Sequence, residues 1–467
     1  RRGLSSFSHH NGGAPIKKLN QVSVTLSQDI MSLHMEETLI GCPFPDVPQL
    51  VCNLQQIRQK KDIVHAQKMH VLMCSYGLET HYEVGNYLVP ALTECGDMVS
   101  GHQVFLRLDH RKEYSWTSML QGYVDYGKPQ DAIDMFKCMQ NDECVRPTAY
   151  TFQTLIKACA QEMSVDEGLL IHCKVVEEGF ESDLFVGSTL VDMYAKVGFV
   201  DESQDVFDEF DAKNVVSWNA LITGYARSGI YEKVLDFLEK MQLDGVCPNA
   251  ITFVCALKYS HSLRYGQEVH LIVVIQGFEN NTLVGNTLVD FYLKHGLLAE
   301  ALEIFNELPG RDVVAWTTLM AGYAEHGLGH HALLCLEKMR SQHVDFNDVT
   351  LICGLKACAS IAKLDKGQEL HAEIAKEGYE KDPYVCNALV DMYARCGLLL
   401  EARDLFDDDL PDRDEVSWNS IISGYVEHGL GNDALSCYDE MKKAAKTPNM
   451  VTFLCVLKAC GIIKALD

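Results

Sequence analysis

Four tryptophans stand at nearly regular intervals and constrain the fold more than any other feature of the sequence. Trp116, Trp218, Trp316 and Trp418 are separated by 102, 98 and 102 residues. Their surroundings align as YSWTSMLQGYVDYG, VSWNALITGYARSG, VAWTTLMAGYAEHG and VSWNSIISGYVEHG. A spacing of about 100 residues holds three periods of about 33, so the sequence predicts an array of short repeats rather than unrelated domains.

Each long period contains three kinds of short unit in a fixed order. Units of the first kind cover 113–148, 215–249, 313–347 and 415–449. Units of the second kind cover 149–183, 250–281 and 348–382, with an incomplete copy at 450–467. Units of the third kind cover 184–214, 282–312 and 383–414. Degenerate copies of the second and third kinds fill 47–112, as 47–81 and 82–112, and leave 1–46 as a flexible N-terminal segment.

Each unit reads as two amphipathic helices joined by a turn. In 215–249 the first apolar stripe consists of Trp218, Leu221, Ile222 and Tyr225. Gly229 is expected to end this helix, and the second stripe consists of Val234, Leu235, Leu238 and Met241. One hairpin cannot bury both apolar faces, whereas stacked hairpins can. The sequence therefore predicts an all-α solenoid of stacked helix-turn-helix units.

One unit of the second kind is short. The copy at 250–281 has three residues fewer than the copy at 149–183, and the loss falls between Leu257 and His270. Because loops tolerate changes of length better than helices do, we expect the loss in the turn between the two helices.

The charge balance argues at first against nucleic acid as a partner. The 467 residues include 40 Lys and Arg and 65 Asp and Glu, which gives a formal net charge of −25. Proteins that neutralise phosphates are usually basic. The longest apolar runs, such as Leu271–Ile275, are too short to cross a bilayer, so we expect a soluble protein without a membrane partner.

The 18 cysteines include no C-x-x-C pair, which is the usual spacing of a structural zinc site. Cys159, Cys358 and Cys460 each stand in a Lys-Ala-Cys tripeptide inside a predicted helix. We interpret the cysteines as small buried side chains in a reducing compartment. No metal and no cofactor are predicted.

The order and lengths of the units closely resemble the PLS class of plant pentatricopeptide repeat (PPR) proteins. In that class a standard P repeat, an L repeat and a short S repeat alternate. The units 215–249, 149–183 and 184–214 have 35, 35 and 31 residues, in the order P, L, S of the family. The SWN-type start, the GxxxH of the L units and the VGNTLVDFY of the S units recur over 47–467. A tetratricopeptide array, the nearest alternative, keeps a constant period of 34.

The resemblance implies a right-handed superhelix of tetratricopeptide-like hairpins that binds single-stranded organellar RNA, one base per unit. In the family, the fifth residue of the first helix and the last residue of the unit read the base, and aliphatic neighbours cover its faces. The pairs and the bases they imply are Ser188 with Asn214 (adenine), Asn219 with Asn249 (cytosine), Asn286 with Asp312 (uracil), Thr317 with Asn347 (adenine), Asn387 with Asp414 (uracil) and Asn419 with Asn449 (cytosine).

Several units depart from this pattern. Asn86 is paired with Lys112, and Thr117 with Thr148, which leaves their base preference open. The L units have Gln153, Val254, Ile352 and Leu454 at the fifth position. An aliphatic side chain cannot bond a base edge, so the implied target is 5′-A-C-n-U-A-n-U-C-3′. The alternative is that these Asn, Ser and Thr residues only cap helices or lie in their first turns.

Cations recur in the same register. Lys157, Lys258, Lys356 and Lys458 hold the ninth position of L units, Lys196, Lys294 and Arg395 hold the thirteenth of S units, and Arg227 holds the thirteenth of a P unit. If the first helices line an RNA groove, these residues are candidates for phosphate contacts. The alternative is a favourable interaction with the helix dipole. Asp125, Glu325 and Glu427 interrupt the row.

No catalytic residue is predicted. His371-Ala-Glu373 matches the H-x-E of zinc deaminases, but the chain has no P-C-x-x-C segment to complete that zinc site. His70, His172, His270 and His371 hold one recurring place, which favours packing or a hydrogen bond between helices.

In the family, such arrays usually continue into E or DYW segments that support cytidine-to-uridine RNA editing. The chain stops at Asp467 inside an L unit, so we expect a fragment. It should recognise RNA for editing or processing, with editing-complex proteins as further partners and no small-molecule substrate. The alternative is a protein-interaction scaffold, which the negative charge favours.

The composition of the first residues suggests where in the cell the protein is located. Residues 1–28 include Arg1, Arg2, Lys17 and Lys18 and no acidic residue, and the first acid is Asp29. This composition is typical of a transit peptide. We therefore expect a mitochondrial or chloroplast protein, with a plain flexible tail as the alternative reading of the segment.

Overall fold

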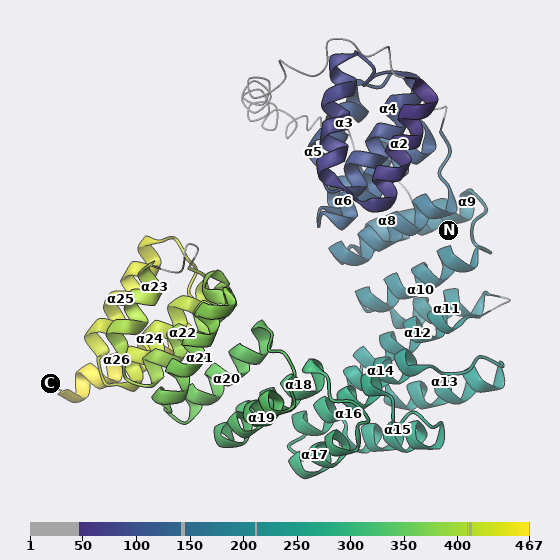
Figure 1. Cartoon of the computed structure of the whole chain (residues 1–467). Helices are drawn as coiled ribbons and strands as arrows, with labels where there is room; N and C mark the ends of the chain where they lie inside the picture. Colours follow the sequence, from purple (N-terminus) through teal and green to yellow (C-terminus); the bar gives the residue numbers. More distant parts are fainter. Residues whose placement is uncertain (1–45, 142–144, 211–212, 409, 411–412, 467) are drawn as a thin grey trace. The chain divides into compact units, whose positions relative to one another are not determined.

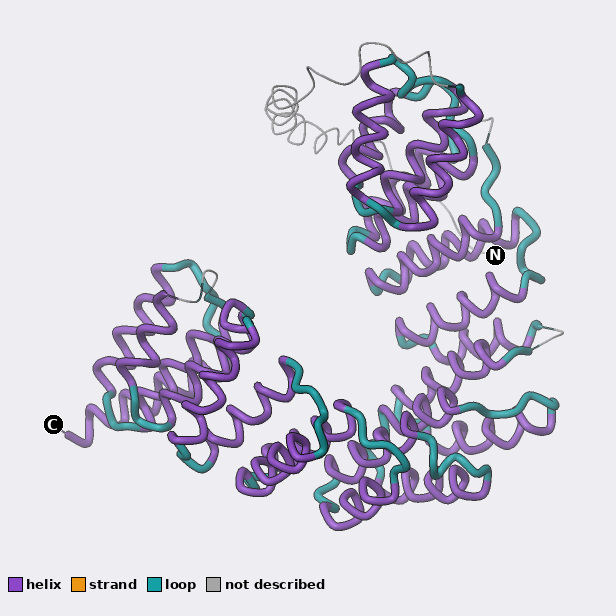
Figure 2. Tube along the Cα trace, viewed as in Figure 1, coloured by secondary structure: helices purple, strands orange, loops and turns teal. Residues whose placement is uncertain are grey.

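The computed structural model describes residues 46–141, 145–210, 213–408, 410 and 413–466, and their regular secondary structure is helical (Figures 1 and 2). It comprises 25 α-helices, α2 to α26, and a 3-10 helix at Tyr379–Lys381, with no strand in these residues. Of the N-terminal segment predicted to be flexible, 1–45 lies outside the described residues, and Asp46 precedes α2. None of the described helices is long and apolar enough to cross a membrane.

Two compact parts divide the chain, Arg1–Ala158 and Cys159–Asp467, and the division falls within α8 (Ala149–Glu162). The first part contains α2 (Val47–Lys60), α3 (Ile63–Ser75), α4 (Tyr82–Glu94), α5 (Met98–Arg107), α6 (Glu113–Asp125) and α7 (Pro129–Met139). Within this part, α2 packs on α4 and α4 on α6. The helices α3 and α5 each pack against the helix that follows them in the chain.

The second part repeats the same arrangement. Its helices are α9 (Val165–Glu177), α10 (Leu184–Val197), α11 (Val200–Asp208), α12 (Val215–Arg227), α13 (Tyr231–Leu243), α14 (Ala250–Lys258), α15 (Leu263–Ile275), α16 (Thr282–Lys294), α17 (Leu298–Glu307), α18 (Val313–Glu325), α19 (Gly329–Ser341), α20 (Asp348–Ser360), α21 (Leu364–Glu377), α22 (Pro383–Arg395), α23 (Leu399–Asp408), α24 (Glu415–Glu427), α25 (Gly431–Lys443) and α26 (Met450–Leu466). The even-numbered helices from α10 to α26 pack on one another in chain order, and each odd-numbered helix from α11 packs against its predecessor. The predicted all-α stack of hairpins is confirmed.

The first helices of the units from α10 to α24 each begin where a polar side chain caps them. The even-numbered helices α2 to α26 begin at the first residues of the thirteen units that the sequence suggests. At α12, Asn214 Oδ1 accepts a hydrogen bond from the Ser217 N–H at 2.8 Å, and the Ser217 hydroxyl faces the backbone of Asn214 in return. Such a capping box satisfies N–H groups that have no partner inside the helix, so the last residue of one unit starts the next.

The predicted stop at Gly229 is also confirmed. Gly229 follows α12 with φ of +74°, a left-handed conformation that favours glycine. The next N–H, of Ile230, donates to the Tyr225 carbonyl at 3.1 Å, which closes the helix end. Both predicted stripes of this unit face the core, except that Leu235 is only half-buried and Phe237 is buried instead.

The recurring tryptophans join each S unit to the P unit that follows it. Trp218 meets Phe207 edge to face, with ring centroids 4.6 Å apart, and the other three tryptophans meet phenylalanines at 4.7 to 4.8 Å in the same way. Such pairs add to the stabilisation from apolar burial. The tryptophans recur because each fills the same place between two helices.

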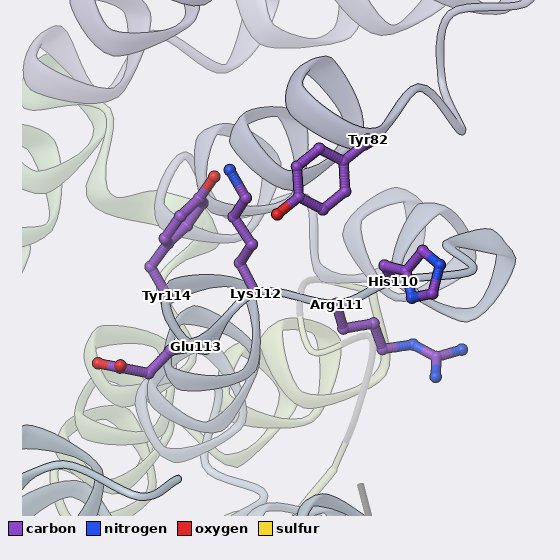
Figure 3. Close-up of a pocket in the computed structure, with 6 residues that line it drawn as sticks. All are labelled: Tyr82, His110, Arg111, Lys112, Glu113 and Tyr114. Carbon is purple, nitrogen blue, oxygen red and sulfur yellow. The ribbon is translucent and has the colours of Figure 1, made fainter. Parts of the chain in front are cut away.

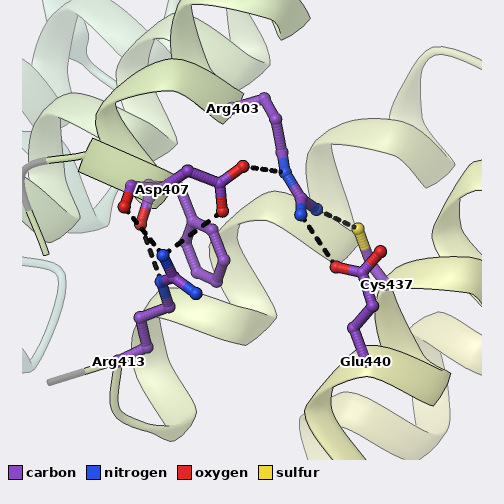
Figure 4. Close-up of polar contacts among 6 residues, drawn as sticks. Arg403, Asp407, Arg413, Cys437 and Glu440 are labelled. Atoms are coloured by element: carbon purple, nitrogen blue, oxygen red, sulfur yellow. Dashed lines mark hydrogen bonds and ion pairs between the residues drawn. The ribbon is translucent and has the colours of Figure 1, made fainter. Parts of the chain in front are cut away.

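Arginines close the outer ends of these helix pairs (Figure 4). Arg413 donates to the carbonyl oxygens of Phe406 and Asp407 at 2.9 and 2.8 Å, which satisfies carbonyls at the end of α23. Arg403 joins α23 to α25, because it donates to Glu440 at 2.8 Å, and it also donates to Asp407 of its own helix at 2.7 Å. Arg111 and Arg311 bond the corresponding carbonyls in two other S units.

The short L unit loses its residues from a helix, so the expectation of a shorter turn is wrong. The helix α14 has 9 residues, whereas α20, its counterpart, has 13. Near the end of α20, the Ala357 carbonyl lies so close to Gly329 that an added Cβ would be 2.7 Å away. In the short unit, Tyr231 holds the place of Gly329, and its ring stacks on that of Tyr265 with centroids 4.5 Å apart. Tyr265 also donates to the Ala256 carbonyl at 3.0 Å and so closes the shortened helix.

Candidate nucleic-acid interface

The candidate positions share one stripe of each first helix. The second, fifth, ninth and thirteenth residues of a unit are three or four residues apart, so they lie above one another on the helix surface. Along this stripe the second residue is exposed in most units, and the fifth residue of the P and S units is largely buried. The stripe therefore combines apolar, polar and charged side chains on one face.

The structure brings fifth and last residues together although they are far apart in sequence. The amide Nδ2 of Asn286 donates to Asp312 Oδ1 at 3.4 Å. The corresponding bonds are 3.3 Å from Asn387 to Asp414 and 3.2 Å from Asn419 to Asn449. Each pair spans 26 to 30 residues, because the last residue caps the next first helix beside the fifth residue. The two side chains can thus act on one ligand.

The last residues also cap helices, as the simpler interpretation of the sequence proposed. One oxygen accepts an N–H from the first turn at 2.8 to 3.1 Å in Asn214, Asn249, Asp312, Asn347, Asp414 and Asn449. The cap uses only this oxygen. It fixes the side chain and leaves the second polar atom, Nδ2 of Asn or Oδ2 of Asp, for another partner.

Three of the fifth-position asparagines have buried oxygens without a donor. Asn219, Asn286 and Asn387 each have an Oδ1 that is inaccessible and receives no hydrogen bond in the described part of the chain. An unsatisfied buried acceptor costs about 1–3 kcal/mol. Asn419 differs, because its Oδ1 accepts a bond from the Thr452 hydroxyl at 2.7 Å. Three units therefore hold an unused acceptor at the same place.

The fifth-position hydroxyls are bonded to their own helices. Ser188 donates to the Leu184 carbonyl at 2.6 Å, Thr317 to Val313 at 2.8 Å, and Thr117 to Glu113 at 2.7 Å. This uses the single hydroxyl hydrogen and leaves the oxygen as an acceptor. Thr148, the last residue of the unit that contains Thr117, instead lies 3.1 Å from the Thr151 hydroxyl.

Asn86 is a clear exception. Its Nδ2 donates to the carbonyls of Tyr82 and His110 at 2.7 and 3.0 Å. Its Oδ1 accepts from the Lys112 N–H at 2.8 Å and from the Ser115 hydroxyl at 2.7 Å. The side chain is fully buried and its hydrogen-bonding capacity is used. Asn86 is therefore a structural residue in this state of the chain.

The surface beside Asn86 is an aromatic pocket of about 580 Å³ (Figure 3). Its lining residues are Tyr82, His110, Arg111, Lys112, Glu113 and Tyr114. The Lys112 ammonium lies 4.4 Å from the centre of the Tyr82 ring and 5.8 Å from that of Tyr114. Aromatic rings beside a cation suit a base and its phosphate without selecting a base edge.

The second residues of the units form a row of exposed side chains whose role was not predicted from the sequence. Its apolar side chains are 46% to 73% exposed, in Tyr150, Phe185, Val216, Ile251, Leu283, Val314, Val349, Tyr384, Val416 and Val451. A recurring exposed apolar residue marks an interaction surface rather than a core. The signal in the sequence is an apolar residue that falls outside the buried stripe of each unit from 149 onward.

The candidate phosphate contacts fall into two classes. Lys157, Lys258, Lys356 and Lys458 of the L units are exposed, and no ion pair to them is found among the described residues. In the S units, aspartates one turn earlier hold the cations at 2.6 to 2.9 Å, as Lys196 with Asp192, Lys294 with Asp290 and Arg395 with Asp391. Arg227 lies over the Tyr259 ring at 5.9 Å. The lysines of the L units are therefore the more available.

The recurring histidines mostly join neighbouring units. The Nδ1 atoms of His172, His270 and His371 lie 2.8 to 2.9 Å from the hydroxyls of Tyr194, Tyr292 and Tyr393. Burial lowers the pKa of His172 and of His270. The predicted hydrogen bond between helices is confirmed for these three. Glu373, the glutamate of the H-x-E match, forms an ion pair in which its Oε2 atom lies 2.6 Å from Arg340 Nη2.

Family models define the class of the chain. The model described as PPR repeat family matches 111–161, 213–259 and 413–461. The model described as PPR repeat matches 150–180, 188–215, 286–313, 314–344 and 384–408. The solved structure of the pentatricopeptide repeat protein PPR10 from maize shares the fold, with a TM-score of 0.55 and 18% identity over 91% of this chain and 69% of that chain.

Relatives from Arabidopsis thaliana agree with these models. The chloroplastic pentatricopeptide repeat-containing protein At4g18520 is 30% identical over 94% of this chain and 71% of its own length. The chloroplastic protein At1g15510 is 31% identical over 93% of this chain and 50% of its own, and the mitochondrial protein At2g03380 is 32% identical over 80% and 55%. The chain belongs to the pentatricopeptide repeat family. It spans about half the length of the first curated relatives that it matches, 50% and 47%.

Proposed function

We propose that this chain binds single-stranded RNA in a sequence-specific manner through a PLS-type array. The observation that carries the proposal is the unused buried oxygen of Asn219, Asn286 and Asn387. The last residues of these three units, Asn249, Asp312 and Asp414, each cap the following helix. Buried polar groups without partners are rare in folded proteins. Their recurrence at one place of three units favours a ligand with one polar edge per unit.

The last residue sets the choice between pyrimidines. Hydrogen bonds from the Ser417 side chain and backbone and from Asn387 outweigh the opposing effect of burial and lower the pKa of Asp414. Its ionised carboxylate only accepts hydrogen bonds, which suits the N3–H of uracil. An asparagine at this place, such as Asn249, offers an Nδ2 donor to the N3 acceptor of cytosine. The Ser and Thr units, with their shorter side chains, leave room for a purine.

The remaining positions complete a nucleotide site without discriminating among bases. The exposed second-position side chains are available to cover base faces. Val254 and Ile352 offer no hydrogen bond to a base edge, so these L units impose no base preference on the nucleotide that they face. The order of the units then gives the target 5′-A-C-n-U-A-n-U-C-3′.

The unit 82–112 holds a nucleotide without reading it. Asn86 has no free hydrogen-bonding group, whereas Tyr82, Lys112 and Tyr114 offer stacking and a positive charge. Its nucleotide lies three positions before the first adenine of the target, because the units 113–148 and 149–183 intervene.

Phosphate attraction is secondary in this proposal. The four exposed lysines of the L units contribute most of it, and the S-unit cations are partly neutralised by aspartates. Affinity for single strands should therefore depend only weakly on salt, since the slope follows the number of phosphates contacted. This accounts for RNA binding by a chain with a net charge of −25.

We infer a biological role from the family and from the relatives. Relatives named as chloroplastic and mitochondrial favour an organellar address. The array would select the site for cytidine-to-uridine editing or for RNA processing. Any base conversion would be supplied by another domain or by an editing-complex partner, because the described residues with H-x-E spacing are engaged in structural bonds.

A binding titration tests the proposal. The 467-residue chain is titrated with labelled RNA that contains ACnUAnUC and with a scrambled RNA of the same composition. Tighter binding of the first RNA by tenfold or more is expected. Equal affinity for both RNAs would contradict base reading. No binding to either would favour a protein-interaction scaffold.

A further inference from the structure

Three potential metal ligands converge in the first L unit, 47–81. His70 and Cys74 lie one turn apart on α3, on the same face of the helix. Glu79 lies in the segment that follows α3. One ligand atom from each side chain lies within 4.8 Å of the other two. The Oε2 atom of Glu79 is 2.9 Å from Cys74 Sγ and 3.9 Å from His70 Nε2.

His70 lacks the partner that its three counterparts have. His172, His270 and His371 each meet a tyrosine hydroxyl from the following S unit. The corresponding place in the unit 82–112 is Leu92, which is buried and offers no hydroxyl. No hydrogen bond to the His70 ring is found in the described residues, and its Nε2 atom lies 3.9 Å from Glu79 Oε2.

Cys74 makes this unit different from the other L units. Glutamate recurs at the place of Glu79, as Glu181, Glu279 and Glu380, and histidine recurs at the place of His70. The place of Cys74 is occupied by Val176, Val274 and Ala375 in the other units. Only 47–81 therefore combines a histidine without a tyrosine partner, a thiol and a carboxylate.

A neighbouring arginine orients the carboxylate. Arg107 Nη1 lies 2.9 Å from Glu79 Oε1, so the Oε2 atom is the one that faces Cys74 and His70. Groups that bond to a metal ligand in this way hold the ligand in place and strengthen metal binding. Asp97, whose charge also acts on His70, is held by the Gln67 amide at 3.0 Å. The side chains of His70 and Glu79 are 17% and 19% exposed, so the site is shielded but reachable.

We propose that His70, Cys74 and Glu79 bind a zinc ion, with a fourth position open to water. A nitrogen, a thiolate and a carboxylate oxygen form a donor set that Zn²⁺ accepts in four-coordinate sites. On binding, the S–H bond of Cys74 breaks, its proton leaves to solvent, and Zn–S, Zn–N and Zn–O bonds form. The thiolate and the carboxylate neutralise the charge of the ion. The metal would join the end of α3 to the segment that leads into α4.

Cobalt binding by the full-length chain tests this proposal. The reduced, metal-free protein is titrated with Co²⁺, which reports a thiolate ligand by a charge-transfer band and four-coordination by intense visible bands. One equivalent of Co²⁺ should produce both signals, and Zn²⁺ should displace it. Cys74→Ser should abolish the charge-transfer band, and His70→Gln and Glu79→Gln should weaken binding at least tenfold. Circular dichroism verifies that each variant is folded.

Matched variants separate this site from adventitious thiol binding. Cys173→Ser removes an exposed cysteine next to His172 in the second L unit and should leave the titration unchanged. Leu92→Tyr keeps all three ligands but gives His70 the partner found in other units, and should weaken cobalt binding. A charge-transfer band that persists in Cys74→Ser, or disappears in Cys173→Ser, would overturn the proposal. So would the absence of stoichiometric binding in the parent chain.

Discussion

The S units 82–112 and 383–414 both have asparagine at the fifth position, and they use it in opposite ways. Asn387 donates to Asp414 at 3.3 Å, and its oxygen has no donor in the described residues. Asn86 makes four hydrogen bonds, which use both its nitrogen and its oxygen. The same residue at the same place is thus open in one unit and closed in the other.

The last residue of each unit accounts for the difference, because it decides which group a serine of the next unit bonds. Ser417, the third residue of its unit, donates to the Asp414 carboxylate at 2.6 Å. Ser115, at the corresponding place, donates to Asn86 Oδ1 at 2.7 Å, because Lys112 has no capping group. In these two units the last residue therefore decides whether the fifth residue remains available. The two positions act as a pair, and neither can be interpreted alone.

Replacing Asp414 with Asn should have the largest effect on base choice. Both residues can cap α24, but the amide offers a donor where the carboxylate offers only acceptors. Preference at this nucleotide should change from uracil to cytosine by about 1–3 kcal/mol. Competition binding with RNAs that differ only at this base measures the change. Unaltered preference for uracil would contradict the role of Asp414.

The same substitution in an open and in a closed unit sharpens the comparison. Asn219→Thr should shift the preference of its unit from cytosine toward adenine with little loss of stability. Asn86→Thr should leave base preference unchanged and destabilise the fold by about 1–3 kcal/mol, because buried partners lose their bonds. Binding assays and urea denaturation of both variants measure the two effects. A change in base choice in Asn86→Thr would contradict the closed state.

Lys112→Asp should open the closed unit. The new carboxylate can cap α6 and accept the Ser115 hydroxyl, as Asp414 does for Ser417, and so release Asn86. The cap should stabilise the chain by about 1 kcal/mol, and the unit should gain a preference for uracil. Lys112→Ala serves as the control, since it removes the charge without supplying a cap. Equal behaviour of the two variants would count against this explanation.

Lysines with and without aspartate partners should differ in their salt effects. Lys356→Ala should weaken binding equally for all sequences and reduce the slope of log affinity against log salt by about 0.7. Lys294→Ala should have a smaller effect, because Asp290 at 2.6 Å already neutralises that ammonium. Titrations at several salt concentrations compare the two variants. Similar slopes for both would remove the distinction between the L and S cations.

The smallest expected effect is a change of folding stability at acidic pH. The pKa of Asp414 is lowered in the folded chain, so its stabilising contribution is present above the ordinary value of 3.8 and is lost as the pH falls through the lowered value. The stability difference between the parent chain and Asp414→Asn should be constant near neutral pH and shrink in acid. Urea denaturation across the pH range measures it. A difference that instead grows in acid would contradict the lowered pKa.

The sequence alone predicted the hairpin stack, because repeated apolar spacing is a local property of the chain. It also predicted that Gly229 ends a helix and that the three histidines pack or form hydrogen bonds between helices. It could not show that Asn86 is closed, since this depends on Ser115 and on two backbone carbonyls brought close by folding. The shortened α14 was also missed, because it depends on Tyr231 and Tyr265, which come from different units.

Selection of RNA ligands from a random single-stranded pool tests the central claim most directly. The full-length chain should enrich A-C-n-U-A-n-U-C, and the nucleotide that faces the unit 82–112, three positions before the first adenine, should remain random. Uracil should be enriched opposite 383–414. An unenriched pool, or a pyrimidine preference opposite 82–112 as strong as that opposite 383–414, would contradict the account.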